Sequence, residues 1–324
     1  MNLVFLGTPD FACASLLALV RAGHSVSAVV TRLDKPAGRG LETTAPPVKD
    51  MAVKLGLPVL QPARVNSPDF VSVLRVLAPE ILVVTAFGAI LKSPLLTLAP
   101  RGAVNVHASL LPAYRGVAPV QWSLIHGRRT TGVTTMLMDE GVDTGPVLGH
   151  RALDVNPGET AGELLARLAR EGGDLLVETL RGLQAGTVRP VPQSTAGVSY
   201  APRLEKEHGF LDLTRPAVGV ANQFRGVTPA PGARVFLGEE AILVGALREV
   251  PGVSGVPYTV MEIAGRHLRV ATGEGAVDLL TVRPPGKKDM EGSAFARGRR
   301  LDPGGRLTPP PTVPDLSLRG TAAR

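Results

Sequence analysis

The apolar run Ala103–His107 contains two polar residues, Asn105 and His107. Side chains alternate between the two faces of a β-strand, so these two share one face and the neighbouring valines share the other. Both lie toward the carboxyl end of the expected strand, where open α/β sheets place their ligand crevice. The pattern indicates a polar site there. A solvent-facing strand end, with Asn105 capping a turn and His107 bonded to a backbone carbonyl, is the open alternative.

A second polar turn, 139–145, also follows an expected strand and can face the same crevice. Within it, Asp143 can hydrogen-bond to the imidazole of His107 and orient that ring. Asp139 and Glu140 are at least as well explained as ordinary turn acids, because aspartate is favoured in turns for backbone reasons. Asn105, His107 and Asp143 are therefore the candidate site residues.

The motifs of several common enzyme classes are missing from the chain. The first turn is Gly7-Thr8-Pro9-Asp10 in place of G-x-G-x-x-G, and neither a Walker A motif nor a G-x-S-x-G elbow occurs. The histidines lack metal-ligand spacing, and a single cysteine, Cys13, excludes a disulfide framework or a thiolate metal cluster. Nicotinamide, P-loop, serine-hydrolase and metal chemistry are therefore disfavoured, and no metal ligand is predicted.

The first half of the chain alternates short apolar runs with helical patterns, which is typical of a mostly parallel α/β sheet. Strands are expected over 2–6, 25–31, 58–60, 81–86, 103–107, 131–138 and 146–153, and helices over 11–22, 48–55, 67–77, 119–125 and 160–184. The most apolar run, 81–86, is the candidate central strand. Residues 32–49 are too polar for a core and are expected to form an exposed loop.

The second half changes character after a linker-like segment rich in proline and small residues. Short alternating runs at 241–247, 259–263, 267–271 and 277–282 suggest a small antiparallel barrel or sandwich. We divide the chain into a first domain at 1–188, a linker at 189–205, a second domain at 206–306 and a tail at 307–324. The tail is proline-rich and is a candidate for partial disorder.

Composition excludes some classes and leaves others open. The 324 residues are 44% hydrophobic and 19% charged, which excludes a mainly disordered chain. No apolar stretch reaches the length of a membrane span and no signal peptide is recognised, so a cytoplasmic protein without membrane contact is the default. The net charge of +7 permits binding to a polyanion, but solubility explains it equally well.

Five motifs together resemble the methionyl-tRNA formyltransferase family. They are GTPDF at 7–11, DKPAGRG at 34–40, NVHASLLPAYRG at 105–116, MDEGVDTG at 138–145 and PPGKKDM at 284–290. The resemblance implies a Rossmann-like catalytic domain with a mostly parallel sheet, followed by a small OB-like β-barrel that binds tRNA. It also implies transfer of a formyl group from 10-formyltetrahydrofolate, a co-substrate rather than a tightly bound cofactor, to the α-amino group of methionyl-initiator tRNA in translation initiation.

The family's catalytic positions fall on Asn105, His107 and Asp143. A free α-amino group titrates near ~7.7–8.0, so part of it is already an uncharged nucleophile at neutral pH. Attack on the formyl carbon places negative charge on its oxygen, which an amide N–H of Asn105 can stabilise. A protonated His107 can add a second donor, and Asp143 would favour that protonated ring and relay protons.

The resemblance also implies where the substrates bind. Folate is expected against two loops that contain Phe87, Gly88, Ile90, Ser109, Leu110, Leu111 and Pro112. Core packing is an equally good explanation for Phe87 or Ile90 taken alone. For tRNA, the implied contacts are Arg39, which matches the family's key arginine, with Lys35, Lys49, Lys287 and Lys288. Leu41, Glu42 and Ala113 depart from positions where relatives are often basic, and the 228–233 segment lacks the aromatic residue that many relatives have.

Two other functions stay open from the sequence. A folate-dependent formyltransferase acting on an amino-sugar nucleotide or another small amine would share the same three catalytic residues. A non-catalytic RNA-binding protein on an α/β scaffold would not need these residues to converge on a pocket. A monomer is expected, although nothing in the sequence fixes the oligomeric state.

Overall fold

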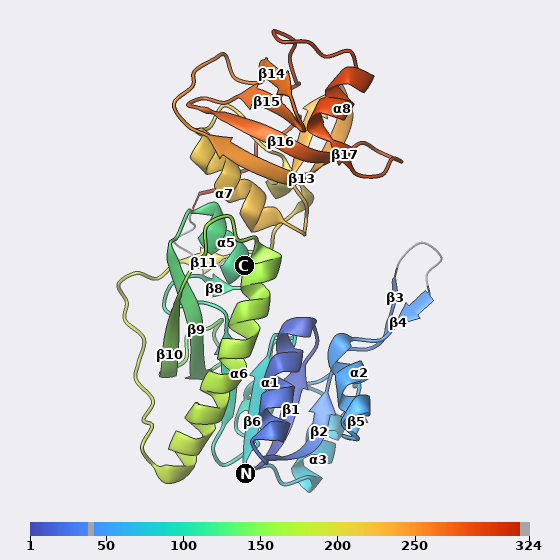
Figure 1. Cartoon of the computed structure of the whole chain (residues 1–324). Helices are drawn as coiled ribbons and strands as arrows, with labels where there is room; N and C mark the ends of the chain where they lie inside the picture. The colour runs from blue at the N-terminus through green and yellow to red at the C-terminus, as the bar shows by residue number, and fades with distance from the viewer. Residues whose placement is uncertain (38–41, 318–324) are drawn as a thin grey trace.

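The computed structural model describes residues 1–37 and 42–317. It has two domains, one below the other in Figure 1, each built around its own sheet. The expected class, a mostly parallel α/β domain followed by a small barrel-like antiparallel domain, is confirmed.

The first domain contains a seven-stranded sheet in the order β10-β9-β7-β6-β1-β2-β5. Its members are β1 (Asn2–Gly7), β2 (Ser25–Val30), β5 (Val59–Leu60), β6 (Ile81–Thr85), β7 (Ala103–His107), β9 (Thr130–Leu137) and β10 (Val147–Asp154). The first five run parallel, and β9 is antiparallel to both of its neighbours. As expected from its composition, β6 is central and buried along its whole length.

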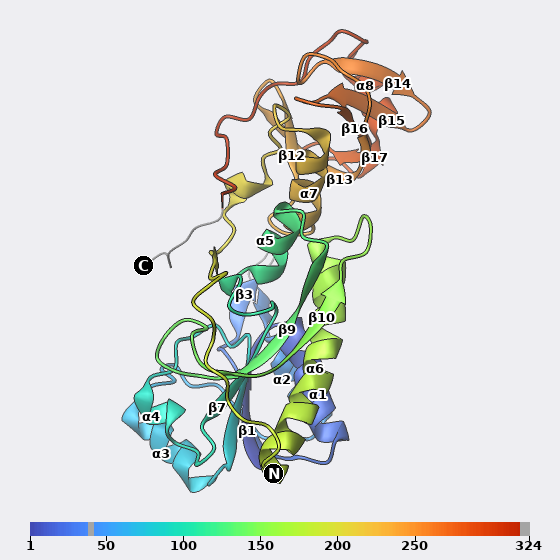
Figure 2. The same ribbon diagram turned by 90° about the vertical axis from the view of Figure 1, so that its left-hand side faces the viewer.

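Helices cover both faces of this sheet, as Figure 2 shows edge-on. One face packs α1 (Asp10–Arg21), α2 (Pro47–Lys54) and α6 (Ala161–Ala185), and the other packs α3 (Pro68–Val76) and α4 (Ser93–Leu96). The 25-residue helix α6 begins with a capping box in which the Thr160 and Glu163 side chains satisfy each other's backbone N–H groups. It ends at Gly186, whose left-handed φ of 71° closes the last turn. Both boundaries are therefore marked by residues that the sequence shows directly.

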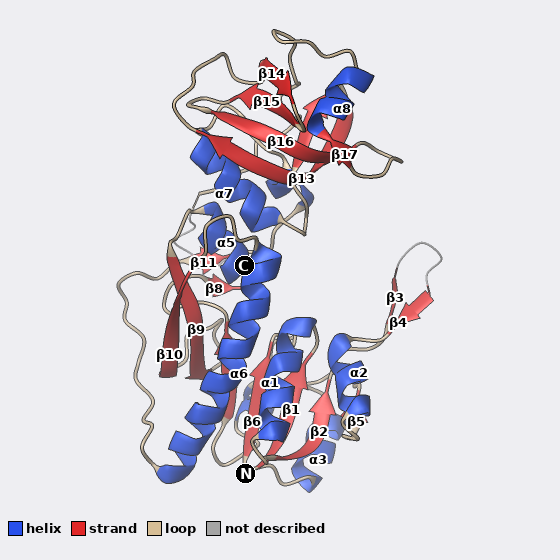
Figure 3. Cartoon of the chain, viewed as in Figure 1, coloured by secondary structure: helices blue, strands red, loops and turns tan. Residues whose placement is uncertain are grey.

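The second domain is antiparallel, with strand order β12-β13-β16-β15-β14 and β17 beside β16. Its elements are α7 (Ala217–Val227), β12 (Arg234–Leu237), β13 (Glu240–Val250), β14 (Val260–Ala264), β15 (His267–Ala271), β16 (Ala276–Arg283), β17 (Met290–Glu291) and α8 (Gly292–Gly298). Figure 3 shows strands forming most of its body, with a helix on either side. Neither α7 nor α8 is expected from the periodicity of the sequence.

The two domains share one hydrophobic core. Helix α5 (Pro119–Ile125) of the first domain packs Trp122 and Ile125 against Phe224 and other apolar residues of the second. An ideal Cβ on Gly226 of α7 would lie 2.5 Å from Ile125 Cγ1 and 2.7 Å from the Gln121 carbonyl oxygen. The close approach of α5 and α7 therefore depends on the missing side chain of Gly226.

The linker packs on the first domain, whereas the tail starts on the second domain, where Thr308 bridges to Phe236, and reaches the first domain at Leu316. Linker strand β11 (Tyr200–Ala201) pairs in parallel with β8 (Arg115–Gly116), and Val191 bridges to Val147. In the tail, Leu307 is buried and the Leu316 carbonyl accepts a hydrogen bond from His126 Nε2 at 3.0 Å. Leu307, before the prolines of the tail, and Leu316, after them, both pack in the shared core. The partial disorder expected for 307–324 stays a prediction.

The segment expected as one exposed loop, 32–49, has structure of its own. Strands β3 (Lys35–Ala37) and β4 (Glu42–Thr44) pair in antiparallel register, and α2 already begins at Pro47. A proline at the first helical position fits there because its fixed φ suits a helix and its missing N–H would have no partner.

Candidate active site

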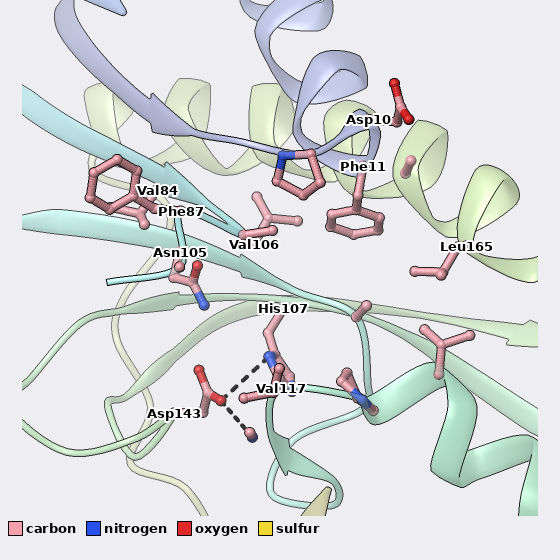
Figure 4. A pocket seen from close by; sticks show the side chains of 18 of the residues that line it. Asp10, Phe11, Val84, Phe87, Asn105, Val106, His107, Val117, Asp143 and Leu165 are labelled. Atoms are coloured by element: carbon pink, nitrogen blue, oxygen red, sulfur yellow. Dashed lines mark hydrogen bonds and ion pairs between the residues drawn. The ribbon is translucent and has the colours of Figure 1, made fainter. Parts of the chain in front are cut away.

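A cleft of about 860 Å³ opens at the carboxyl ends of β6 and β7. The turn between β1 and α1 contributes one wall, the segment after β6 a second, and the N-terminal half of α6 a third. Figure 4 shows Val84 and Phe87 to one side of Asn105, and Phe11 and Leu165 to the other. The cleft therefore has two apolar regions with the polar residues of β7 between them.

Strand alternation in β7 places Asn105 and His107 in this cleft, as expected. They are buried, with 9% and 6% of their surface exposed, so the solvent-facing alternative is wrong. That alternative also expected His107 to bond to a backbone carbonyl, and this part is correct, because His107 Nε2 lies 2.9 Å from the Tyr114 carbonyl oxygen. Because a carbonyl only accepts hydrogen bonds, Nε2 carries a proton. The other ring nitrogen, Nδ1, is then the one that faces the cleft residues.

Asp143 lies beside that nitrogen, with its Oδ2 3.6 Å from His107 Nδ1 (Figure 4). The same Oδ2 accepts the Gly116 backbone N–H at 2.8 Å, which fixes the carboxylate in place. Asp143 has a left-handed φ of 53°, an unusual conformation for a residue with a side chain. A doubly protonated His107 ring would have an acceptor on each side.

The other two acids of this turn are structural. Asp139 accepts hydrogen bonds from the Gly141 N–H at 3.0 Å and the Thr144 hydroxyl at 2.6 Å. Asp139 and Glu140 are exposed, and neither lines the cleft. This is the turn-building role expected for such acids.

The side-chain amide of Asn105 has no hydrogen-bond partner among residues 1–37 and 42–317, although the residue is buried. The amide nitrogen and oxygen are not enclosed by protein and remain open to the cleft, so they are available to a ligand oxygen or nitrogen.

Of the residues expected to bind folate, Phe87 and Gly88 line the cleft. Ile90 is 71% exposed and outside the lining. The segment Ser109–Pro112 also lies outside it, because the Ser109 hydroxyl bonds to the Ala113 carbonyl at 2.6 Å and its backbone carbonyl accepts from Thr134. The structure therefore brings only part of the expected folate set together.

The residues expected to contact tRNA lie away from the cleft. Lys35 is exposed on β3, and Lys49 Nζ forms an ion pair with Asp34 at 2.6 Å. Lys287 and Lys288 are exposed in the turn between β16 and β17. Arg39 lies outside the described residues. Figure 1 shows that the β3–β4 strands and the β16–β17 turn extend to the same side of the molecule.

Several cleft residues are missed by sequence reasoning. Phe11 stands in the GTPDF motif, which offered a signal, whereas Leu165 and Ala169 look like ordinary apolar positions of an amphipathic helix. Beside the cleft, Gln193 binds the backbone carbonyls of Asp143 and Gly145, and it gave no signal because it falls in a segment with linker composition. Arg115, which donates to Gln193, stands in the NVHASLLPAYRG motif.

Within the described ranges, no group of three or more His, Cys, Asp or Glu side chains is arranged to hold a metal ion. No helix in those ranges is long and apolar enough to cross a membrane.

Comparison with known proteins identifies the family of both domains. The family model described as formyl transferase matches residues 1–180, and the one described as its C-terminal domain matches 203–300. Methionyl-tRNA formyltransferase of Myxococcus xanthus (strain DK1622) is 46% identical over 303 residues, covering 94% of this chain and 96% of that protein.

Solved structures share the fold at low identity. HypX from Aquifex aeolicus in complex with tetrahydrofolic acid has a TM-score of 0.63 at 16% identity, over 91% of this chain and 47% of HypX, so this chain spans about half of that protein. An N-formyltransferase from Helicobacter canadensis in complex with folinic acid and dTDP-3-aminofucose has a TM-score of 0.64 at 17% identity, over 87% and 98%.

The α/β domain with its cleft and the barrel-like domain after it are the two domains of a formyltransferase. Given the identity and coverage of its relatives, the chain belongs to the methionyl-tRNA formyltransferase family. The family indicated by the five sequence motifs is thus confirmed.

Proposed function

We propose that the cleft transfers the formyl group of 10-formyltetrahydrofolate to the α-amino group of methionyl-initiator tRNA, in the cytoplasm where translation begins. The observation that carries this is the unpartnered amide of Asn105 beside the His107–Asp143 pair, between two apolar regions of one cleft. Two regions suit a reaction with two organic substrates that meet at a polar centre.

Each of the three polar residues, Asn105, His107 and Asp143, has a different role in the proposed reaction. The amide of Asn105 donates to the formyl oxygen as negative charge builds there, in a cleft where water does not weaken the bond. His107, held by the Tyr114 carbonyl, presents Nδ1 toward the reacting groups and Asp143. Asp143 accepts a proton from the attacking amine, directly or through one water. The folate nitrogen gains a proton as its bond to the formyl carbon breaks, so the proton lost by the amine is balanced by the one taken up by the leaving group.

Apolar side chains near Phe87 fit a flat ring system, and we assign the folate to that region. Val84, Phe87 and Gly88 form it, and Gly88 has a left-handed φ of 79° that turns the chain beside the cleft. Ile90 and Ser109–Pro112 are left out of this assignment because they do not line the cleft. Folate acts as a co-substrate that leaves after each turnover.

The tRNA would lie along the side of the molecule where the β3–β4 strands and the β16–β17 turn extend (Figure 1). Lys35, Lys287 and Lys288 offer exposed positive charge there, and Arg39 stays a predicted contact. Lys49 contributes less because its charge is paired with Asp34. We propose that the chain acts as a monomer.

The test is a formylation assay with 10-formyltetrahydrofolate and four acceptors: methionyl-initiator tRNA, methionyl-elongator tRNA, an amino-sugar nucleotide and free methionine. We expect rapid formylation of the initiator alone. Preferred formylation of the amino-sugar nucleotide would identify the small-amine alternative, and RNA binding without folate turnover would identify a non-catalytic RNA-binding protein.

A further inference from the structure

The linker residue Gln193 makes five hydrogen bonds next to the cleft, one of them a weak contact from Nε2 to Met136 Sδ at 3.9 Å. Its Nε2 donates to the carbonyl oxygens of Asp143 and Gly145, both at 2.8 Å. Its Oε1 accepts from the Arg115 guanidinium, at 3.2 Å from Nε and 2.8 Å from Nη2. One amide therefore uses both its donor and its acceptor side to join the Asp143 turn to β8.

Arg115 occupies a special place in the chain. The residue before it, Tyr114, supplies the carbonyl that holds His107, and the residue after it, Gly116, supplies the N–H that holds Asp143. Arg115 is 8% exposed, and Gln193 supplies the acceptor for its guanidinium. A buried guanidinium needs such an acceptor, because unpaired burial of a charge is costly.

The conformation of Asp143 also needs support. A left-handed φ at a residue other than glycine costs of order 1 kcal/mol and persists only where surrounding contacts enforce it. Gln193 binds the carbonyl of Asp143 itself and that of Gly145, two residues later. The turn is therefore held on the backbone side by the linker and on the side-chain side by Gly116.

We propose that Gln193 is a positioning residue for formyl transfer, which sets the placement of the Asp143 carboxylate against His107 Nδ1 without touching either substrate. Gln193 lies outside the cleft lining, so it acts through Asp143. The inference rests on the function proposed above. It makes the linker part of the catalytic apparatus as well as a connection between domains.

The test is Gln193→Met, which keeps the length of the side chain and removes its amide. We expect kcat to fall by about 10- to 100-fold, the cost of a catalytic group displaced by about 1 Å. KM for folate and for tRNA should stay within about twofold of the wild-type value, because no substrate contact is lost.

Gln223→Met is the matched control. Gln223 is also a buried glutamine whose Nε2 donates to two backbone carbonyls, those of His208 at 3.0 Å and Phe210 at 2.8 Å, but it lies in the second domain. Gln223→Met should lower the unfolding temperature and leave kcat unchanged. A merely structural role for Gln193 would give this same result in Gln193→Met and would overturn the proposal.

A second measurement does not depend on turnover. The imidazole NMR signal of His107 at a fixed pH, assigned by its loss in His107→Gln, should have a displaced chemical shift in Gln193→Met and the wild-type chemical shift in Gln223→Met. An unchanged chemical shift in Gln193→Met contradicts the proposal. A wild-type protein that formylates nothing would refute the proposed function instead, whatever this signal shows. If Gln193→Met does not fold, Arg115→Lys, which loses the forked contact to Gln193, is expected to show the same shift.

Discussion

The environment of Asn105 favours a chemical role, since its amide is open to the cleft and has no hydrogen-bond partner in the described part of the chain. In the proposed mechanism, Asn105→Ala removes the donor to the developing oxyanion. We expect single-turnover formyl transfer to slow by about 10²- to 10³-fold. Folate affinity, measured by calorimetry, should change little because the apolar region around Val84 and Phe87 is untouched.

Asn156→Ala is the control for that substitution. Asn156 is exposed in the turn between β10 and α6 and lies outside this cleft. It should transfer formyl at the wild-type rate. A wild-type rate in Asn105→Ala as well would remove the amide from the mechanism.

Among single residues, the sequence predicts those whose position depends on chain periodicity. Strand alternation was enough to place Asn105 and His107 in one cleft, and a second turn at the same sheet edge was enough for Asp143. Gln193 could not be predicted, because it binds backbone carbonyls far away in the chain and such bonds leave no pattern. Ile90 was wrongly expected to line the cleft, because the sequence does not show whether an apolar side chain in a loop faces the protein or the solvent.

Among the elements, β16 carries a buried charge at the centre of the second sheet. Burial raises the pKa of Asp278, but hydrogen bonds from Arg269 and Arg248 on the neighbouring strands outweigh it, so the pKa lies below its usual value. A depressed pKa means that the stabilisation is complete above the unfolded value near ~3.9 and is lost as the pH falls through the folded one.

We therefore expect Asp278→Asn to lower the free energy of unfolding at pH 7 by about 1.5–3 kcal/mol, as for hydrogen bonds to a charged group. The difference from the wild type should shrink as the pH falls toward the lowered pKa of the native carboxylate. Urea unfolding at pH 7 and at one acidic pH measures this. Asp289→Asn is the control, because its pair with Arg283 is half-exposed and contributes little. Equal losses at both pH values would exclude the charge as the cause.

Long, periodic elements such as α6 and β6 were predictable because their apolar spacing and caps are local. Helix α7 was not, since Gly219 and Gly226 interrupt its pattern and its apolar face packs against elements distant in the chain, α5 of the other domain with β13 and β16 of its own. The β3–β4 pairing was missed for a similar reason: three-residue strands in a polar segment carry no usable alternation.

For the molecule as a whole, one added methyl group at Gly226 can test whether the shared core couples the two domains. Gly226→Ala would place a Cβ against Ile125 and the Gln121 carbonyl and push α5 from α7. We expect a loss of about 1–3 kcal/mol, as for other overpacked sites. Calorimetry should show the unfolding of the two domains becoming less cooperative.

Gly298→Ala, at the end of α8, is the matched control because nothing lies within 4 Å of the added carbon. Its unfolding should match the wild type. If Gly226→Ala also unfolds as the wild type does, the α5–α7 contact does not couple the domains.

At the scale of the molecule, the sequence predicted the net charge but not which basic side chains are paired with acids. The basic stretch between 283 and 306 includes arginines already engaged by acids, with Arg283 bonded to Asp289 and Arg299 to Glu240. The sequence could not separate these from exposed Lys287 and Lys288, because pairing depends on which strands become neighbours.

The shared core also fixes the distance between the two domains. The distance from the cleft to the barrel-like domain is set by Trp122 and Phe224 packing in one core, and the length of the linker does not determine it. Extra residues inserted in the exposed stretch 194–197 would lengthen the linker without moving either domain. Side-chain packing therefore fixes the spacing between the cleft and the second domain.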